Sequence, residues 1–355
     1  MGIATARSSA GLILTALLAG ATVVSAVDGS AKKDERELSY PEGAAIPRSL
    51  TDAERQFIRR NPITAVDRGT TSPPSGPIHC FAEYEPMEGI LMAYEGSNSW
   101  KDILDEMAAN ITTTGDANVY VMVDSTAEGN SAVSFMTAAG ADASRIFPIV
   151  ATTDSIWIRD YGPRYISVGG TRAIVDHTYN RPRPNDNLQP TAFSNYTGHP
   201  KHDIPLVHGG GNFHLDASAE RWAYATELIA NENPGLTEAE IIDLWRDYQN
   251  LETTLTDPFP TFVDATQHID MWMQIVADRK VIISDWPNNP GSTQDQICDF
   301  WADELDDRGY TVFRVPARNI SGTHYTYTNM VLCNNLALVP QYTNSGVSGF
   351  NAQAI

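Results

Sequence analysis

Apolar positions along the chain follow two spacings in turn from residue 81 onward. Short apolar runs typical of buried strands occupy residues 89–94, 118–123 and 145–150. Stretches with apolar side chains at helical spacing occupy residues 100–113 and 127–139. Strands that alternate with helices in this way predict an α/β fold.

The second half of the chain repeats one order of elements. The pattern predicts strands at 211–216, 222–227, 268–276, 281–286, 310–315, 328–333 and 336–340, and helices at 237–251 and 294–307. Asp278-Arg-Lys and Asn334-Asn335 are the expected hairpin turns. The order strand, strand, helix, strand therefore recurs, although the last hairpin is followed only by the polar residues 344–355.

Polar residues open these units at a nearly fixed interval. Asn212, Asp270 and Asn329 are separated by 58 and 59 residues. A fixed period indicates a repeat architecture, and radial repetition would bring the first strand of each unit to a central axis. The polar residues would then converge on one site. The alternative is an open α/β sheet with coincidental spacing. We also expect the last unit to be incomplete.

The N-terminal part of the chain has a different composition. Arg7 followed by the apolar residues 11–24 and by Val24-Ser-Ala predicts a signal peptide over 1–26, and hence a secreted protein. Residues 27–78 are polar and predict a pro-segment or linker with one short helix at 52–60. The packed domain is expected over 79–343, and 344–355 form an irregular tail.

The net charge of the chain indicates which classes of binding partner it can have. The formal net charge is −20, which argues against nucleic acid and anionic membranes and suits a cationic substrate. The same charge could simply reflect solubility. Three cysteines, Cys80, Cys298 and Cys333, do not form a disulfide framework. No oligomeric state follows from the sequence.

Four segments are dense in residues that can carry chemistry. Asp154 to Pro163 contains two acids, an arginine and Trp157, which could stack on a planar cation, although a structural ion pair would give the same pattern. His268 and Asp270 are expected on one face of a strand, where they suit proton transfer better than metal binding. His208-Gly-Gly-Gly-Asn212 lacks a phosphate-loop pattern, so its glycines are expected to permit close backbone approach.

The fourth segment is the loop Arg181-Pro-Arg-Pro. Its prolines predict an extended, stiff conformation, and the two arginines could both face one carboxylate. A solvated, proline-rich loop with no ligand is the alternative.

The ordered motifs of the chain resemble a known family. Phe81-Ala-Glu-Tyr-Glu-Pro-Met-Glu-Gly, Trp157-Ile-Arg-Asp-Tyr-Gly-Pro, Gly209-Gly-Gly-Asn, His268-Ile-Asp-Met and Tyr327-Thr-Asn are similar to those of bacterial-type (Porphyromonas-type) peptidylarginine deiminases and agmatine deiminases. The resemblance covers about residues 79 to 343. It implies a pseudo-fivefold α/β propeller of ββαβ units, with the last unit incomplete here.

The resemblance also implies roles for seven residues. These are two carboxylates that grip the substrate guanidinium (Asp160, Asp270), a general acid/base (His268), a polar site residue (Asn329), a packing residue (Trp157) and two arginines that bind a substrate carboxylate (Arg181, Arg183). The implied reaction is hydrolysis of peptidyl or C-terminal arginine to citrulline and ammonia through a cysteine thiolate, without cofactor or metal. Agmatine, which has no carboxylate, is the alternative substrate.

The cysteine of such an enzyme is expected near the C-terminus, several tens of residues beyond Asn329. Only 26 residues follow Asn329 here, and Cys333 is expected to be a core thiol. No nucleophile is therefore assigned. A truncated deiminase, a non-catalytic guanidinium binder and an unstable fragment remain as separate hypotheses.

Overall fold

Three consecutive stretches of the chain fold into the same unit in the computed structural model, which describes residues 2–7, 38–41, 43–66 and 72–355. Each unit is an antiparallel strand pair, a helix, and a strand parallel to the second strand. The first has β6 Arg164–Val168, β7 Thr171–Tyr179, α5 Gln189–Thr197 and β8 Lys201–His208. The second has β9 His214–Leu215, β10 Trp222–Thr226, α7 Glu238–Gln249 and β11 Glu252–Thr256. The third has β12 Met273–Ala277, β13 Lys280–Asp285, α8 Thr293–Asp307 and β14 Thr311–Pro316.

The remaining sheets differ from this unit. An all-parallel sheet contains β3 Gly89–Ala93, β4 Asn118–Val123 and β5 Ile146–Val150, connected by α2 Asn98–Thr113 and α3 Thr126–Ala138. The last hairpin is β17 Val331–Cys333 and β18 Leu336–Gln341, with β1 Gly2–Arg7 parallel to β18. Short elements are β2 Ile78–Cys80, which joins β6, the pair β15 Arg318–Ile320 and β16 Thr323–Tyr325, and α6 Leu228–Glu232.

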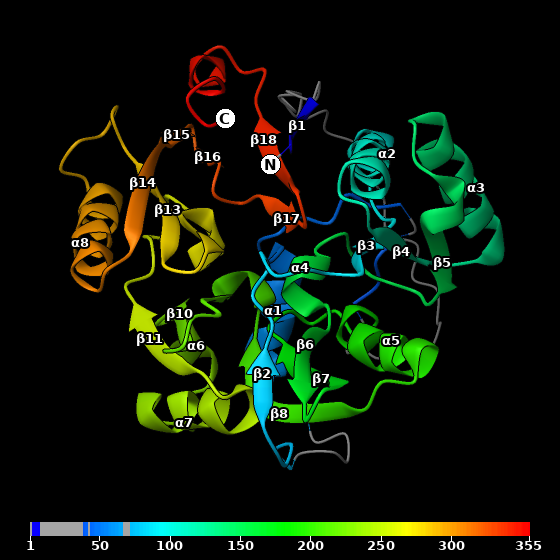
Figure 1. The fold of residues 1–355 in the computed structure, drawn as a ribbon, viewed down its shortest axis with the longest axis horizontal. Helices are drawn as coiled ribbons and strands as arrows, with labels where there is room; N and C mark the ends of the chain where they lie inside the picture. The colour runs from blue at the N-terminus through cyan, green and yellow to red at the C-terminus, as the bar shows by residue number, and fades with distance from the viewer. Residues whose placement is uncertain (1, 8–37, 42, 67–71) are drawn as a thin grey trace, which may run out of the picture.

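These sheets surround a central region, where the one-turn helix α4 Ile158–Tyr161 lies (Figure 1). Helices α3, α5, α7 and α8 lie on the outer rim (Figure 1). The α/β fold and the repeated strand-strand-helix-strand order are therefore confirmed. Closure into a fivefold propeller stays a prediction.

Three predicted strands begin later than expected, and the one predicted at 328–333 starts only at Val331. Residues 211–216 and 268–276 were expected to be strands, but the chain forms 3-10 turns at Gly210–Asn212 and Ile269–Met271 before β9 and β12 start. Asn212 explains part of this difference, because its side-chain oxygen accepts hydrogen bonds from the backbone N–H of Thr226 and Ile269. Asn212 therefore links two units and is not a site residue.

The N-terminal segment 38–66 lies against the domain. Its helix α1 Asp52–Arg60 has the predicted bounds, and Thr51 and Glu54 form a capping box at its start. Glu54 is fully buried, which is unusual for an acid in a predicted linker. Whether this segment is a pro-segment stays a prediction. The predicted signal peptide lies outside the described residues except for β1, so that prediction is not tested.

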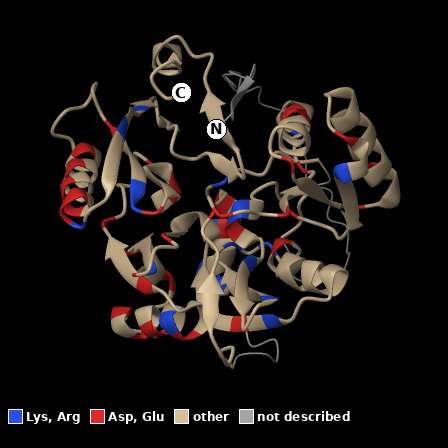
Figure 2. Ribbon diagram, in the orientation of Figure 1, with Lys and Arg blue, Asp and Glu red and all other residues tan. Residues whose placement is uncertain are grey.

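Charged residues are distributed between the surface and the centre. Figure 2 shows acidic residues along the outer helices α7 and α8, and a group of both signs in the central region. Within the described residues, no helix is long and apolar enough to cross a membrane.

Candidate active site

Three predicted site residues meet around Gly211. A Cβ atom on this glycine would lie 2.7 Å from one carboxylate oxygen each of Asp160 and Asp270, and 2.8 Å from Nδ1 of His268. A side chain there would force these three groups apart, because real Cβ atoms essentially never approach heavy atoms so closely. The predicted close approach at the glycine run is therefore confirmed, and it packs the two acids and the histidine together.

Asp160 and His268 form an ion pair inside the protein. Nδ1 of His268 lies 3.3 Å from Oδ1 of Asp160, which also accepts a hydrogen bond from the Gly211 N–H at 3.0 Å. Burial opposes ionisation of Asp160, but His268 and these hydrogen bonds hold its pKa at about 2. Burial alone would lower the pKa of His268, yet Asp160 and Asp270 raise it above its usual value.

Asp270 has the opposite electrostatic character. Burial raises its pKa to about 7, although His268 and Arg159 favour the ionised form. Its Oδ1 atom and Nε2 of His268 are buried and have no hydrogen-bond partner among the residues that the structure describes. Buried polar atoms without a partner are costly, so a polar ligand group that bonded these two would be stabilised.

The backbone around His268 is held in a strained conformation. Gln267 has φ of +60°, a left-handed value that is uncommon for a residue other than glycine. Its carbonyl accepts a hydrogen bond from Thr226 Oγ1, and its side chain donates to the Phe259 carbonyl. Thr328 Oγ1 donates to the Asp270 carbonyl at 3.0 Å. Neighbouring segments thus fix the histidine and the acid, as a preorganised site requires.

Trp157 and Asn329 lie beside this cluster and make no hydrogen bond to its side chains. Trp157 contacts the edge of Trp100, with ring centroids 5.6 Å apart, and Asn329 donates to Met271 Sδ. Both line a cavity of about 1280 Å³, which also borders Arg159. The three clustered side chains are not among the residues that line this cavity.

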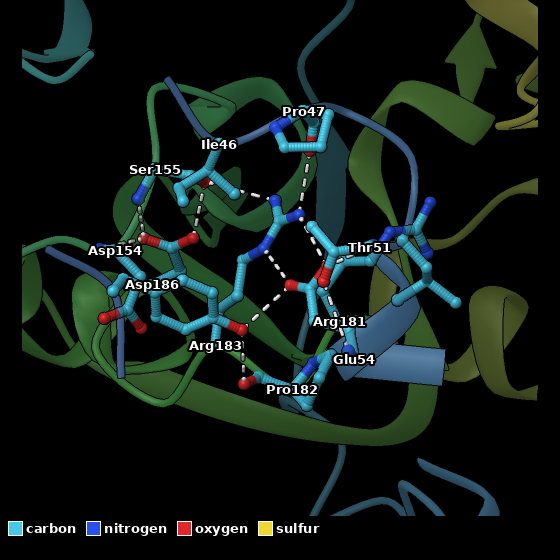
Figure 3. A network of polar contacts seen from close by, with 12 residues as sticks. Ile46, Pro47, Thr51, Glu54, Asp154, Ser155, Arg181, Pro182, Arg183 and Asp186 are labelled. Atoms are coloured by element: carbon cyan, nitrogen blue, oxygen red, sulfur yellow. Dashed lines mark hydrogen bonds and ion pairs between the residues drawn. The ribbon is translucent and has the colours of Figure 1, made fainter. Parts of the chain in front are cut away.

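The two arginines of the Arg181-Pro-Arg183 loop are buried, which contradicts the expectation of an exposed loop. Arg183 pairs with Glu54 of α1, with Nε to Oε1 at 2.8 Å and both side chains fully buried (Figure 3). Arg181 donates to the Asn180 carbonyl. It is close enough to lower the pKa of Asp160. The structure therefore brings Arg181 to the cluster and gives Arg183 a partner within the chain.

Two further acids near the centre were missed by sequence reasoning. Glu232, at the end of α6, accepts a hydrogen bond from Asn180, and burial raises its pKa to about 7 while Arg181 and His268 lower it. Glu83 binds Arg159 through both carboxylate oxygens at 3.0 and 3.1 Å. Glu83 also accepts from the backbone of Leu332, so it ties α4 to β17. Glu232 lies in none of the motifs of the sequence, so no pattern pointed to it. Glu83, by contrast, lies in the motif that begins at Phe81.

All three cysteines are core thiols. Cys80, Cys298 and Cys333 are unpaired and buried, each in a different hydrophobic cluster. Burial raises the pKa of Cys80 to about 12 and that of Cys333 to about 11, and it also raises the pKa of Cys298. A thiol of such high pKa is protonated at neutral pH and is a poor nucleophile.

Among the described residues, one group of acids outside the cluster has metal-ligand spacing. Asp285, Asp295 and Asp299 place one oxygen each within 4.8 Å of the others. Arg314 lies 3.7 Å from Asp285 and 2.8 Å from Asp299. Because Arg314 pairs with two of the three acids, we interpret the group as an ion-pair network at the start of α8.

The fold and this acid–histidine cluster define a class of protein. The fold is shared with an agmatine deiminase of Enterococcus faecalis (TM-score 0.66, 17% identity, 80% of this chain and 90% of that one). It is also shared with a C. jejuni agmatine deiminase solved with substrate bound (TM-score 0.63, 16% identity, 78% and 88%). Residues 79–349 match the Porphyromonas-type peptidyl-arginine deiminase family, and the chain belongs to this family.

Proteins that are similar to this chain in sequence are named agmatine deiminases. A Photobacterium profundum protein, provisionally named an agmatine deiminase, is 27% identical over 268 residues, which are 69% of this chain and 66% of that protein. An agmatine deiminase of Ectopseudomonas mendocina is 26% identical over 62% of this chain and 64% of its own length. In both cases the match spans less than two thirds of the relative.

Proposed function

We propose that this chain binds the guanidinium group of a small substrate of the agmatine type and belongs to an enzyme that hydrolyses it to a ureido group and ammonia. The observation that carries this proposal is the meeting of Asp160, His268 and Asp270 around Gly211. A guanidinium is a planar cation with five N–H donors, so two carboxylates on one site are natural acceptors.

The two carboxylates differ in a way that suits the reaction. Asp160 has a pKa of about 2 and carries the permanent charge that attracts the cation. Asp270, with a pKa of about 7, becomes fully charged when a cation arrives. His268, whose pKa is raised, can donate its proton to the leaving nitrogen and later accept one from water. In this proposal His268 is the acid/base that serves the group that must leave.

Two observations favour agmatine over peptidyl or C-terminal arginine. The named relatives are agmatine deiminases. Arg183, proposed as a ligand for a substrate carboxylate, is paired with Glu54. Hydrolysis of arginine in peptides is the weaker alternative, and secretion of the protein stays a prediction.

A non-catalytic guanidinium binder is the second candidate, and it is favoured by the burial of all three thiols away from the cluster. Calorimetric titration with agmatine tests binding, and a colorimetric assay for the ureido product tests hydrolysis. Binding with hydrolysis supports the enzyme, and binding without it supports the second candidate. Failure of agmatine to bind would contradict both.

A further inference from the structure

Three consecutive backbone carbonyls of the N-terminal segment cover the residues proposed to contact the distal part of a substrate. The carbonyl oxygens of residues 46, 47 and 48 accept hydrogen bonds from Trp157 Nε1 at 2.8 Å, Arg183 Nη2 at 2.8 Å and Arg181 Nε at 3.5 Å. Backbone carbonyls are acceptors that the main chain of a bound peptide could also offer. The segment therefore takes up N–H donors of Trp157, Arg181 and Arg183 that would otherwise be free for a ligand.

The segment also provides a carboxylate. Glu54 Oε1 accepts from Arg183 Nε at 2.8 Å, and Oε2 lies 3.5 Å from Nη2 (Figure 3). The remaining acceptors around this guanidinium are Pro47 O, Ser155 Oγ and Tyr179 OH. An arginine has five N–H groups, and five acceptors surround this one. No N–H of Arg183 is left for a carboxylate of a ligand.

Glu54 is held in place independently of Arg183. Tyr40 OH donates to its Oε1 at 2.8 Å, and the Thr51 N–H of the capping box donates to Oε2 at 2.7 Å. Burial alone would raise the pKa of Glu54, but Arg183 and these donors lower it. The carboxylate is therefore charged and fixed before any ligand arrives.

The same segment is anchored on the far side of the cluster. Arg48 forms an ion pair with the buried Asp264 at 2.9 Å and contacts Met271 Sδ. Met271 follows Asp270 directly, so the segment spans from the Arg181 loop to the 3-10 turn that carries the acid. Contacts at both ends hold the three carbonyls and Glu54 in fixed positions relative to the acid–histidine cluster.

We propose that Glu54 is a specificity-determining residue. Its carboxylate pairs with Arg183 and so takes the position that the carboxylate of a substrate would need. This inference rests on the proposed guanidinium site. A guanidinium compound that ends in an amine is accepted, whereas free arginine or a C-terminal arginine must displace a buried, fully hydrogen-bonded ion pair. Displacement is costly because both charges were desolvated when the chain folded. Glu54 touches no substrate and acts through Arg183.

The test compares two ligands on three proteins. Agmatine and arginine, which differ by one carboxylate, are titrated calorimetrically into the full chain, Glu54→Gln and Glu240→Gln. Glu240 is the matched control, because it forms the same capping box with Thr237 on α7 but is exposed. In Glu54→Gln the charge of Arg183 becomes available to a carboxylate, so we expect arginine to gain about tenfold in affinity relative to agmatine. The control should leave this ratio unchanged.

The outcomes separate the two proposals. If agmatine does not bind the unaltered chain, the guanidinium site itself is overturned. If agmatine binds the unaltered chain no better than arginine does, only the role of Glu54 is overturned. The same holds if the ratio of arginine affinity to agmatine affinity is equal in Glu54→Gln and Glu240→Gln.

A milder variant covers the case in which Glu54→Gln does not unfold cooperatively. Tyr40→Phe removes one donor to Glu54 and keeps the ion pair. The affinity ratio should then move in the same direction by about threefold, since one hydrogen bond to a charged group is weakened. An unchanged ratio in this variant also overturns the inference.

Discussion

Two buried charged clusters lie close together in this protein, and they differ in how completely their atoms are paired. Around Arg183 and Glu54, five acceptors face the five N–H groups of the guanidinium. Around Asp160 and His268, by contrast, Nε2 of the histidine and Oδ1 of Asp270 have no hydrogen-bond partner within the described part of the chain. A fully paired buried cluster has no bond left to offer, whereas unpaired atoms beside two carboxylates and a histidine can still bond a ligand.

The completeness of hydrogen bonding shows which buried charged residues stabilise the fold and which are available to a ligand. Residue type alone would place Arg183 with the site, because arginine is a natural ligand for a carboxylate. Its complete set of partners places it with the structure that holds the N-terminal segment. The comparison therefore predicts that loss of a charge from the paired cluster mainly lowers stability, whereas loss of a charge from the unpaired cluster mainly weakens agmatine binding.

The largest expected effect is on the paired cluster. Glu54→Ala leaves the guanidinium of Arg183 buried without a counter-charge, which should lower the free energy of unfolding by about 3–5 kcal/mol. We expect the Tm to fall by on the order of 10 °C in a thermal scan followed by circular dichroism. Glu240→Ala, on an exposed helix start, should cost about 0.5 kcal/mol or less. Equal losses in the two variants would mean that the buried pair is not structural.

The next effect is on the unpaired cluster. Asp160→Asn removes the charge that grips the guanidinium, so agmatine binding should weaken by about 2 kcal/mol, or roughly 30-fold. Asp216→Asn is the control, because Asp216 is equally buried but accepts from the backbone of Ser218 and Arg279. Calorimetry on both variants checks this prediction. A similar loss in the control would show that any buried charge affects binding, and the comparison would fail.

The smallest effect depends on pH. The pKa of Asp270 is about 7 in the folded protein, compared with about 4 for an ordinary aspartate. Between these values the unfolded chain has lost the proton while the folded chain keeps it, so stability falls as pH rises from about 4 to 7 and stays low above that.

Asp270→Asn cannot ionise and therefore escapes this loss. Relative to the unaltered chain, the variant should gain on the order of 1 kcal/mol, or roughly 2 °C in Tm, when the pH is raised from 5 to 8. Thermal scans at the two pH values measure this difference. A change in Tm that is the same at pH 5 and pH 8 would argue against a raised pKa at Asp270.

Most elements of the fold could be predicted from local pattern. The helices over α2, α7 and α8 and the strands β4 and β13 lie within one or two residues of their predicted bounds, because burial of one face imposes the helical or strand period. The starts of β9 and β12 were predicted too early. The hydrogen bond that Asn212 accepts from Ile269 of the next unit and the positive φ of Gln267 turn the backbone there, and neither leaves a local period.

The sequence by itself determined the repeat, the family and the identity of the acid–histidine cluster, because motifs and their spacing are properties of the chain. Only the tertiary structure decided what Arg183 does, since Glu54 lies 129 residues away in the sequence. It also decided that all three thiols are core residues and that Gly211 is the point where the cluster meets. The physical reason is that pairing, burial and pKa depend on which groups surround a side chain, and those neighbours come from segments that no local pattern connects.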